Sequence, residues 1–507
     1  MKNLILAYDL GTGGLKGSIF DESGESINEC FVSYNTYFPK TGHNEQNPLD
    51  WWDAFVRSTK ELLENKLAII ENIICIAVSG HSLGSIPIGK NGKLLIESVP
   101  IWSDTRASKQ AQKFFDNISL EKWYEATGNG FPAHLYSIFK IMWYKDNMRS
   151  LYEETFKFIG TKDYINYQLT GKLFTDYSYA SGSGVYDLKE QKYKQEFIEN
   201  AGVSYDKLPD ILSSTEIIGN ILPETAKILG LKENVKVVCG GVDNSCMALG
   251  TGCVKDGMAY TSIGSSAWIA VSSHEPVLDF KYKPYVFAHC IPDMFVSSTS
   301  IFSAGTSFSW VKDTICKNLI NEKEPYKIMD EMASKSEVGS KKLIFNPSLA
   351  GGSSIEKSPN IKGGFIGLNL GHTQNDLIRA SMEGICLNLK MALEIMEQYV
   401  FISEDMLIAG GGSKSSFWRR LFADIYNKNI LETSIGQNAA ALGAAALGAV
   451  GMMIWPDFNK VNEVLTIKSI TKPERENEKK YKIILGLFKK VAELQSDIGN
   501  IIEEITW

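Results

Sequence analysis

With 507 residues, the chain is too long for one hydrophobic core, and at about 150 residues per domain it predicts two to four domains. Its composition, 44% apolar and 22% charged, is that of an ordinary folded protein and excludes a disordered or fibrous chain. The net charge of −7 and the lack of a basic tract argue against a nucleic-acid-binding surface.

Neither a secretion signal nor a membrane span is expected. The N-terminal apolar run breaks at Asp9, and the longest uncharged stretch, 439–455, is mostly Ala and Gly and ends before Pro456. The eight cysteines include no C-x-x-C pair, which favours reduced, buried thiols over a zinc site. We therefore expect a soluble, cytoplasmic protein.

The first part of the chain alternates strands and helices. Apolar runs predict strands at 4–11 and 18–21 and from residue 27, joined by a glycine-rich turn at 11–14 and a second turn at 21–26. Asn47-Pro48 precedes an amphipathic helix over 49–67, and 73–80 is typical of a buried strand. The alternation continues to about residue 240 and indicates an α/β domain around a mixed sheet.

A second region echoes the first in form. Residues 257–272 again predict strand, glycine turn and strand, and 407–425 predict a strand that leads through a glycine turn into a helix. We therefore expect two α/β domains, at 1–247 and 248–507, with a cleft between them. Residues 467–482 are rich in Lys and Glu and are expected to begin a tail that ends in a helix over 481–505.

The glycine turn from Asp9 to Lys16 fits neither standard phosphate loop. Lys16 stands where a dinucleotide fingerprint needs its third glycine, and the Gly-Lys-Ser/Thr of a Walker loop is absent. The turn can still bring backbone N–H groups, the Thr12 hydroxyl and the Asp9 carboxylate to a phosphate, with Mg²⁺ between them. A plain glycine hairpin is the alternative.

Two further glycine turns, at 262–266 and 410–413, favour a clamp on a polyphosphate nucleotide, although periodicity alone leaves this open. Asp243 follows an apolar strand and two glycines, where a carboxylate can accept a hydroxyl proton. Asp is also a preferred helix cap, so a capping role is the alternative for Asp243.

Together these motifs resemble the FGGY family of carbohydrate kinases, most closely its xylulokinase-like branch, from about residue 4 to residue 455. Residues 363–368 and 376–383 fit the family's C-terminal signature position by position. The N-terminal signature departs at Leu135 and Tyr144 and is otherwise met by Ser137, Lys140, Ile141, Trp143, Asp146 and Asn147. Residues 101–107, 160–171 and 303–313 and Asp176 are also similar to the family.

The resemblance implies an α/β fold of two actin-like, ribonuclease-H-like domains with ATP and sugar in an interdomain cleft. It implies that Asp243 is the catalytic base and that Asp9 binds Mg²⁺. The residues implied to bind the nucleotide are Thr12, Gly13, Gly264, Ser265, Gly305, Gly411, Gly412 and Ser415. Those implied to bind the sugar are His81, Ser82, Trp102, Asp104, Asp243 and Asn244.

The implied reaction is ATP-dependent phosphorylation of a hydroxyl of a ketopentose-like sugar, with xylulose as the leading candidate. The loop His81-Ser82-Leu83-Gly84 departs from the Gln-Met-His-Gly of typical xylulokinases, because its histidine is shifted two places and Leu83 takes the usual position. L-xylulose, ribulose, gluconate and small polyols therefore stay open. Glycerol is disfavoured, since Ser82 and Leu83 replace an Arg-Glu pair and Leu135 replaces a Tyr.

Several residues have structural alternatives. His81 can be a satisfied buried histidine, Trp102 can be plain core, and Arg106 can form an ion pair with Asp104 that fixes the loop. The Ala-rich stretch 439–455 is expected as a helix beside the adenine site. An actin-like ATPase or chaperone is the alternative of another class, although little of the chain remains for a peptide-binding region. The expected partners are a sugar and ATP, with a homodimer left open.

Overall fold

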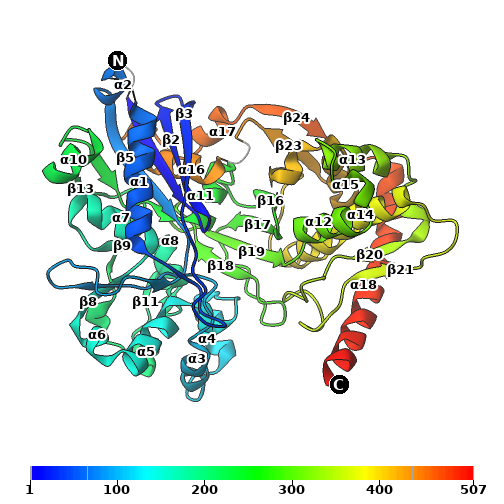
Figure 1. The fold of residues 1–507 in the computed structure, drawn as a ribbon, viewed down its shortest axis with the longest axis horizontal. Helices are drawn as coiled ribbons and strands as arrows, with labels where there is room; N and C mark the ends of the chain where they lie inside the picture. The colour runs from blue at the N-terminus through cyan, green and yellow to red at the C-terminus, as the bar shows by residue number, and fades with distance from the viewer. Residues whose placement is uncertain (1–2, 65–66, 436–437, 506–507) are drawn as a thin grey trace. The chain divides into compact units, whose positions relative to one another are not determined.

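The computed structural model describes residues 3–64, 67–435 and 438–505 and divides into two compact units (Figure 1). Unit 1 comprises Met1–Val254, Ser272–Val296 and Asn438–Leu465. Unit 2 comprises Lys255–Val271, Ser297–Gln437 and Thr466–Trp507. Each unit therefore combines segments that are far apart in the sequence.

Unit 1 is built on a mixed sheet. Its strands are β1 (Leu4–Leu10), β2 (Gly14–Asp21), β3 (Ser26–Ser33), β5 (Ile73–Gly80), β13 (Ile217–Asn220), β14 (Lys236–Val238) and β15 (Gly241–Val242). They run in the order β13-β14-β5-β1-β2-β3, and β15 also pairs with β5. β1 and β2 form an antiparallel hairpin, whereas β5 runs parallel to β1, β14 and β15. The predicted α/β domain around a mixed sheet is confirmed.

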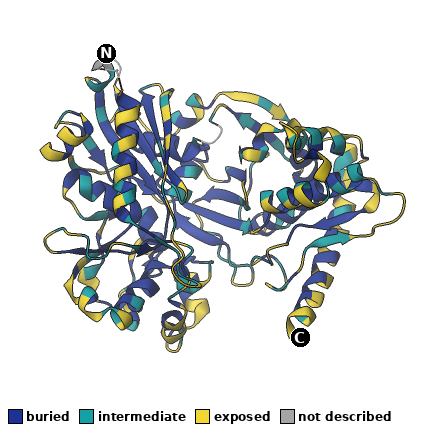
Figure 2. Cartoon of the chain, viewed as in Figure 1, coloured by how far each residue is buried: buried dark blue, intermediate teal, exposed yellow. Residues whose placement is uncertain are grey.

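Helix α1 (Pro48–Leu63) packs against β2 and β3 and begins as predicted. The Asn47 side chain accepts a hydrogen bond from the backbone N of Leu49 (2.9 Å), and Pro48 takes a first-turn position where it needs no N–H donor. The amphipathic pattern buries Trp51 and Phe55 and leaves the opposite side of the helix exposed (Figure 2). Residues 65–66 of the predicted helix lie outside the described residues.

The Ala-rich stretch forms helix α16 (Ala439–Gly451), which belongs to unit 1. It packs against β1, β5 and α11 (Asp243–Gly250), all within unit 1. A Cβ on Gly443 would come within 2.0 Å of the Cys246 carbonyl, and one on Gly250 within 1.7 Å of the Ala439 carbonyl. Small residues thus allow α16 to support the helix that begins with Asp243, and its expected place beside the adenine site stays a prediction.

The remaining helices of unit 1 are short and lie mostly between β5 and β14 in the sequence. Their bounds are α2 (Leu67–Ile70), α3 (Ser108–Phe115), α4 (Leu120–Thr127), α5 (Ser137–Asn147), α6 (Arg149–Glu154), α7 (Thr161–Thr170), α8 (Tyr177–Ala180), α9 (Gln195–Ala201), α10 (Pro223–Leu229) and α17 (Lys460–Val464). Of these helices, α3–α6, α8 and α9 contribute to a second apolar cluster that includes Phe114, Trp123 and Phe139, whereas α7 and α10 pack into the core of the mixed sheet. All eight cysteines of the chain are buried free thiols, as predicted.

The sheet of unit 2 repeats the connectivity of unit 1. Its strands are β16 (Ala259–Ile263), β17 (Ala267–Ser273), β19 (Phe295–Ile301), β22 (Asp405–Gly410), β23 (Asn429–Thr433) and β24 (Ile467–Thr471). β16 and β17 form an antiparallel hairpin, β22 runs parallel to β16, and β23 runs parallel to β22. The order β19-β17-β16-β22-β23 thus matches β3-β2-β1-β5-β14. The predicted echo between the two regions is confirmed.

The helices of unit 2 are α12 (Gly305–Thr314), α13 (Pro325–Ser334), α14 (Gln374–Met396), α15 (Ser416–Tyr426) and α18 (Arg475–Glu504). The tail expected over 467–482 is partly wrong, because β24 pairs with β23 and α18 already begins at Arg475. The Lys- and Glu-rich composition gave no sign of β24 or of the start of α18, since exposed strands and helices contain the same residue types as unstructured tails. Among the described residues, no helix is both long and apolar enough to cross a bilayer.

Candidate active site

Three strands of unit 1 bring the candidate catalytic residues to one edge of the sheet. In the parallel pairing, Asp9 of β1 and Gly241 of β15 both lie opposite Ser79 of β5. His81 follows β5 directly, and Asp243 follows β15 directly. The carboxyl ends of parallel strands are where open α/β sheets bind their ligands, so this edge is the candidate active site.

Asp243 has an unusual acidity for a carboxyl group. Burial, and then the negative charge of Asp9, raise the pKa of Asp243 to about 7. Its Oδ1 accepts hydrogen bonds from the backbone N (2.8 Å) and the Nδ2 (3.1 Å) of Asn244, and these oppose the shift less strongly. The capping alternative is wrong, because Val242 occupies the cap position of α11 and Asp243 is its first residue. A carboxyl group with this pKa can take up a proton near neutral pH.

Burial also raises the pKa of Asp9, against the opposing effects of the Lys16 charge and of a hydrogen bond from the Ser79 hydroxyl (Oγ–Oδ1 3.3 Å). Lys16 lies directly across the hairpin from Asp9. Among the described residues there is no cluster of three or more His, Cys, Asp or Glu that could hold a metal ion by itself. A single carboxylate such as Asp9 can still serve Mg²⁺ in its common form, in which water and phosphate are the other ligands, and this role of Asp9 stays a prediction.

His81 is buried and uncharged. Burial, and then the positive charge of Lys140, lower the pKa of its imidazole to about 3. The ring meets Trp51 edge-on, with 5.4 Å between centroids, and neither ring nitrogen has a hydrogen-bond partner within the described part of the chain. Since buried polar groups are rarely left unpaired, the His81 ring is not a satisfied core histidine and is available to a ligand hydroxyl.

The loop after β5 is held from several sides. The carbonyl of His81 accepts hydrogen bonds from the Thr161 hydroxyl (2.6 Å) and the Tyr179 hydroxyl (3.1 Å). Ser82 is buried beside it, and Leu83 adopts a left-handed φ of 61°. A non-glycine residue in this conformation is strained, and such strain concentrates at functional sites.

Lys140 of α5 ties this loop to the next one. Its buried Nζ donates hydrogen bonds to the carbonyls of Leu83 (2.9 Å) and Ile101 (2.7 Å), and burial lowers its pKa to about 7. Sequence reasoning noticed Lys140 only as a signature position and did not give it a role. Two carbonyls that converge on one ammonium group identify it as a positioning residue for the loops that carry His81 and Trp102.

Trp102 is not a plain core residue, because 39% of its surface is exposed and its ring nitrogen forms a hydrogen bond. Its Nε1 donates a hydrogen bond to the Thr12 hydroxyl (2.9 Å), and Gln46 Nε2 donates to the Thr12 carbonyl (2.7 Å). Gly13 is exposed beside Thr12 in the turn between β1 and β2. The structure therefore brings a predicted sugar-binding residue, Trp102, to a predicted phosphate-binding one, Thr12.

Asp104 is fully buried, and both oxygens of its carboxylate already accept hydrogen bonds from within the chain. Arg106 donates to it through Nε (2.8 Å), Nη2 (2.7 Å) and backbone N (3.0 Å), and the backbone N of Asn44 donates a fourth hydrogen bond (2.7 Å). Four donors match the four acceptor positions of a carboxylate. The ion pair that fixes the loop is confirmed, whereas direct contact between Asp104 and a sugar stays a prediction.

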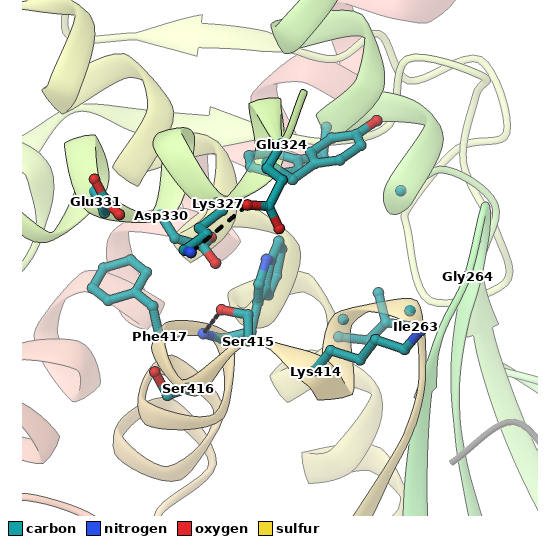
Figure 3. Close-up of a pocket in the computed structure, with 16 residues that line it drawn as sticks. Ile263, Gly264, Glu324, Lys327, Asp330, Glu331, Lys414, Ser415, Ser416 and Phe417 are labelled. Atoms are coloured by element: carbon teal, nitrogen blue, oxygen red, sulfur yellow. Dashed lines mark hydrogen bonds and ion pairs between the residues drawn. The ribbon is translucent and has the colours of Figure 1, made fainter. Parts of the chain in front are cut away.

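Unit 2 contains a cavity of about 760 Å³, within the range of small-molecule sites. It lies among the end of β16, the starts of α12 and α15, the turn after β22, and α13 (Figure 3). The cavity is lined by Ile263, Gly264, Gly305, Phe308, Glu324, Tyr326, Lys327, Asp330, Glu331, Gly411, Gly412, Lys414, Ser415, Ser416, Phe417 and Trp418. This set includes five of the eight predicted nucleotide-binding residues.

The backbone makes one wall of this cavity. Gly305 donates its N–H to the carbonyl of Gly264 (3.0 Å), and a Cβ at Gly305 would lie 2.4 Å from that carbonyl oxygen. Ser265 does not line the cavity. Its carbonyl accepts hydrogen bonds from the backbone N of Ala304 (3.0 Å) and Thr306 (3.1 Å), so Ser265 positions the start of α12.

Aromatic rings make the opposite wall. Phe308 stacks on Tyr326 (5.7 Å between centroids) and meets Trp418 edge-on (5.5 Å), which gives an apolar surface suited to a nucleobase. Asp330 of α13 also lines the cavity, and burial raises its pKa. Figure 3 shows Asp330 facing Ser415, whose hydroxyl accepts a hydrogen bond from the backbone N of Trp418 (3.1 Å). Sequence reasoning missed the α13 residues, because they belong to none of the segments that resemble the family.

Comparison with known proteins identifies the chain's relatives. Residues 4–250 match the N-terminal domain of the FGGY family of carbohydrate kinases, and residues 259–452 match its C-terminal domain. The chain is 28% identical to a xylulose kinase of Staphylococcus xylosus over 96% of this chain and 99% of that protein. Its structure resembles the crystal structure of a gluconate kinase from Lactobacillus acidophilus with a TM-score of 0.90, over 98% of this chain and 99% of that one. The two sequences are 25% identical. A xylulose kinase structure from the same organism is also 25% identical (TM-score 0.89, 96% and 97% covered).

These matches extend over nearly the whole chain and include both candidate sites. They confirm the α/β fold of two actin-like, ribonuclease-H-like domains that the sequence motifs implied. The motifs had implied a transfer of phosphate to an alcohol group, and the domain matches place this chain among enzymes of that class. The protein belongs to the FGGY family of carbohydrate kinases.

Proposed function

We propose that this protein transfers the terminal phosphoryl group of ATP to a hydroxyl of a ketopentose, that the ketopentose is xylulose, and that Mg²⁺ is required. The observation that carries the proposal is Asp243, a carboxyl group with a pKa raised to about 7 beside Asp9 at the carboxyl edge of the sheet. The similarity to xylulose kinases over the full chain supports the choice of sugar. The gluconate kinase structure makes gluconate the next candidate.

Asp243 acts as the general base. Its carboxylate takes the proton of the sugar hydroxyl while that oxygen forms a bond to the terminal phosphorus of ATP, and the bond from phosphorus to the ADP oxygen breaks. Phosphoryl transfer needs little covalent help from the protein, so positioning and charge stabilisation account for most of the catalysis. Asn244 holds Asp243 Oδ1 through two hydrogen bonds and thereby orients the carboxylate.

Asp9 provides the metal-binding carboxylate. When bound, Mg²⁺ would neutralise part of the phosphate charge. The donors at this edge of the sheet suit the cation, since Asp9 offers a hard carboxylate oxygen and the remaining ligands can be water and phosphate. Thr12 and Gly13, in the turn that follows Asp9, are the proposed phosphate contacts on this side.

The sugar contacts come from the loops that Lys140 connects. The neutral His81 ring can donate one hydrogen bond and accept another, which suits a sugar hydroxyl. Trp102 offers an apolar ring face to the carbon side of a sugar, and Ser82 and Asn244 complete the set. Asp104 contributes by holding the Trp102 loop through Arg106.

ATP occupies the cavity of unit 2 in this proposal. Gly264, Gly305, Gly411, Gly412 and Ser415 line it together with the aromatic wall. Residues 1–247 would form the domain that binds the sugar, and residues 248–507 the domain that binds the nucleotide. We place the enzyme in the cytoplasm, where ATP and free sugars are both available.

A coupled assay of ADP release across xylulose, L-xylulose, ribulose, gluconate, glycerol and erythritol tests the proposal. Xylulose should stimulate ADP release most strongly, and Asp243→Asn should abolish most of that stimulation. If gluconate stimulated ADP release more strongly than xylulose, gluconate would be the substrate in place of xylulose. ATP turnover that no sugar changes would contradict a kinase and favour the actin-like ATPase or chaperone.

A further inference from the structure

Unit 1 contains a buried cluster of charged side chains that the proposed mechanism does not use. Lys162 and Asp163 of α7, and Asp176 at the end of β9 (Phe174–Asp176), are all fully buried. Lys162 Nζ lies within hydrogen-bond distance of Asp163 Oδ1 (2.7 Å), Asp176 Oδ1 (3.0 Å) and the Cys239 carbonyl (3.1 Å), so its three N–H donors have three acceptors. Because desolvation offsets much of the attraction in a buried ion cluster, such a cluster is weak evidence for stability. The geometry that it fixes is more informative.

The second oxygen of Asp176 orients two serine hydroxyls. Asp176 Oδ2 accepts hydrogen bonds from the Ser178 hydroxyl, the Ser178 backbone N (2.9 Å) and the Ser214 hydroxyl (2.7 Å). Both serines are fully buried. A hydroxyl has one hydrogen and two lone pairs, and the hydrogen of Ser178 is directed at the carboxylate. The Ser178 oxygen is therefore held as an acceptor for another donor.

That donor is the backbone N–H of Val242, which lies 2.9 Å from Ser178 Oγ. Val242 is the last residue of β15 and the cap residue of α11, and Asp243 follows it directly. β15 has only two residues and pairs with β5 alone, so few hydrogen bonds of the sheet hold it. A side-chain hydrogen bond to Val242 therefore constrains the backbone at the point where Asp243 begins.

The same cluster holds the residues that precede β15. The Cys239 carbonyl accepts hydrogen bonds from Lys162 Nζ (3.1 Å) and from Asn166 Nδ2 (2.8 Å). The backbone N of Gly240 donates to the carbonyl of Ser214 (3.0 Å). The whole connection from β14 to α11 is thus held by contacts with one buried polar cluster, and Ser178 provides the contact nearest to the carboxyl group that acts as the base.

We propose that Ser178 is a positioning residue for Asp243, an inference that rests on the proposed function of Asp243 as the general base. The Ser178 hydroxyl, oriented by Asp176, holds the Val242 N–H and thereby keeps the Asp243 carboxylate in place. A general base works only within hydrogen-bond reach of the proton that it takes. A displacement of about 1 Å can lower the rate about 10²-fold, so loss of this hydrogen bond should affect catalysis more than stability.

Two serine substitutions form a matched test. Ser178→Ala and Ser214→Ala each remove one buried hydroxyl from Asp176 Oδ2, but only Ser178→Ala removes the acceptor of the Val242 N–H. Ser214→Ala keeps the backbone carbonyl that Gly240 uses. In steady-state ADP release, Ser178→Ala should lower kcat about 10–100-fold and leave the KM for ATP nearly unchanged. Ser214→Ala should keep kcat within about twofold of the wild type, and thermal melting should show similar, small losses for both variants.

Hydrogen–deuterium exchange separates this inference from the proposed function. Backbone amides of residues 240–244 should exchange faster in Ser178→Ala than in the wild type or in Ser214→Ala, because the Val242 N–H loses its acceptor. Unchanged exchange in this segment, or equal kcat values for the two variants, would overturn the positioning role. If no sugar stimulated ADP release by the wild type, the proposed function would fail, whereas the exchange rates would still decide whether Ser178 holds the backbone before Asp243.

Discussion

Corresponding loops of the two units carry different chemistry. In unit 1 the loop after β5 contains His81, and the neighbouring strand ends carry Asp9 and Asp243, so this site depends on side chains. In unit 2 the corresponding turn after β22 begins with Gly411 and Gly412, and the turn after β16 contains Gly264, so the cavity there depends on the backbone. In the proposed function, the same strand connectivity thus serves acid–base chemistry in unit 1 and close approach to the nucleotide in unit 2.

Their difference has a kinetic consequence. Side chains that move protons affect the rate of the chemical step, whereas glycines that shape a cavity affect binding of the molecule that fills it. Substitutions in unit 1 should therefore lower kcat, and those in unit 2 should raise the KM for ATP.

The largest effect is expected from Asp243→Asn. Loss of the general base should lower kcat by about 10²–10⁴-fold with little change in the KM for ATP. Steady-state ADP release measures both constants, and Asp206→Asn on the exposed surface is the control. A variant with normal kcat would remove Asp243 from the mechanism.

The same substitution should stabilise the folded protein at high pH. Because the pKa of Asp243 is raised in the folded state, ionisation of this group costs stability as the pH rises from about 4 to about 7, and the loss is complete above pH 7. Asp243→Asn should therefore raise the free energy of unfolding by about 2–4 kcal/mol at pH 8 and change it little at pH 4. Urea unfolding at the two pH values measures the difference, and equal effects at both would contradict the raised pKa.

The pH dependence of the wild type should report the same group. With a pKa of about 7, Asp243 is protonated at lower pH and cannot act as a base, so kcat/KM for the sugar should fall about tenfold per pH unit below 7. Asp9→Asn removes the neighbouring negative charge and should move the midpoint to lower pH in its residual activity. A flat profile between pH 5 and 8 would be inconsistent with Asp243 as the base.

In unit 2, two glycines make a matched pair. A Cβ at Gly305 would lie 2.4 Å from the Gly264 carbonyl, whereas one at Gly411 would meet no atom within 4 Å. Gly305→Ala should raise the KM for ATP about tenfold, since forcing a methyl group into packed structure costs ~1–3 kcal/mol. Gly411→Ala should have a much smaller effect on ATP binding. Equal effects of the two would show that the backbone contact does not shape the site.

The smallest effect is expected from Trp102→Phe. This change keeps an aromatic face and removes only the hydrogen bond to the Thr12 hydroxyl (2.9 Å). One such bond contributes about 1 kcal/mol, so the KM for the sugar should rise roughly fivefold. Thr12→Val removes the other partner and should give a similar change, with no further loss in the double variant. Additive losses would mean that the two residues act independently.

Much of the fold was predictable because its signals are local. The strands around the first glycine turn, the Asn47-Pro48 start of α1 and the three glycine turns follow from apolar runs and turn residues. β24 was missed because its residues are mostly exposed and have the composition of a tail. The contacts of α16 with β1, β5 and α11 were not predicted, because an all-round apolar, small-residue helix does not specify which neighbour it contacts.

The candidate site was predictable as a set of residues but not as an arrangement. Asp9, His81 and Asp243, the glycine turns and the family could be identified from the amino-acid order, since these are patterns along the chain. The folded structure was needed to show that the Asp104 carboxylate accepts hydrogen bonds from Arg106 and Asn44, that Lys140 joins two loops, and that α13 borders the cavity of unit 2. The acidity of Asp243 also follows from the fold, because a pKa depends on burial and on nearby charges, and the pairing of β1 and β15 with β5 brings Asp9 near Asp243, 234 positions away (243 − 9).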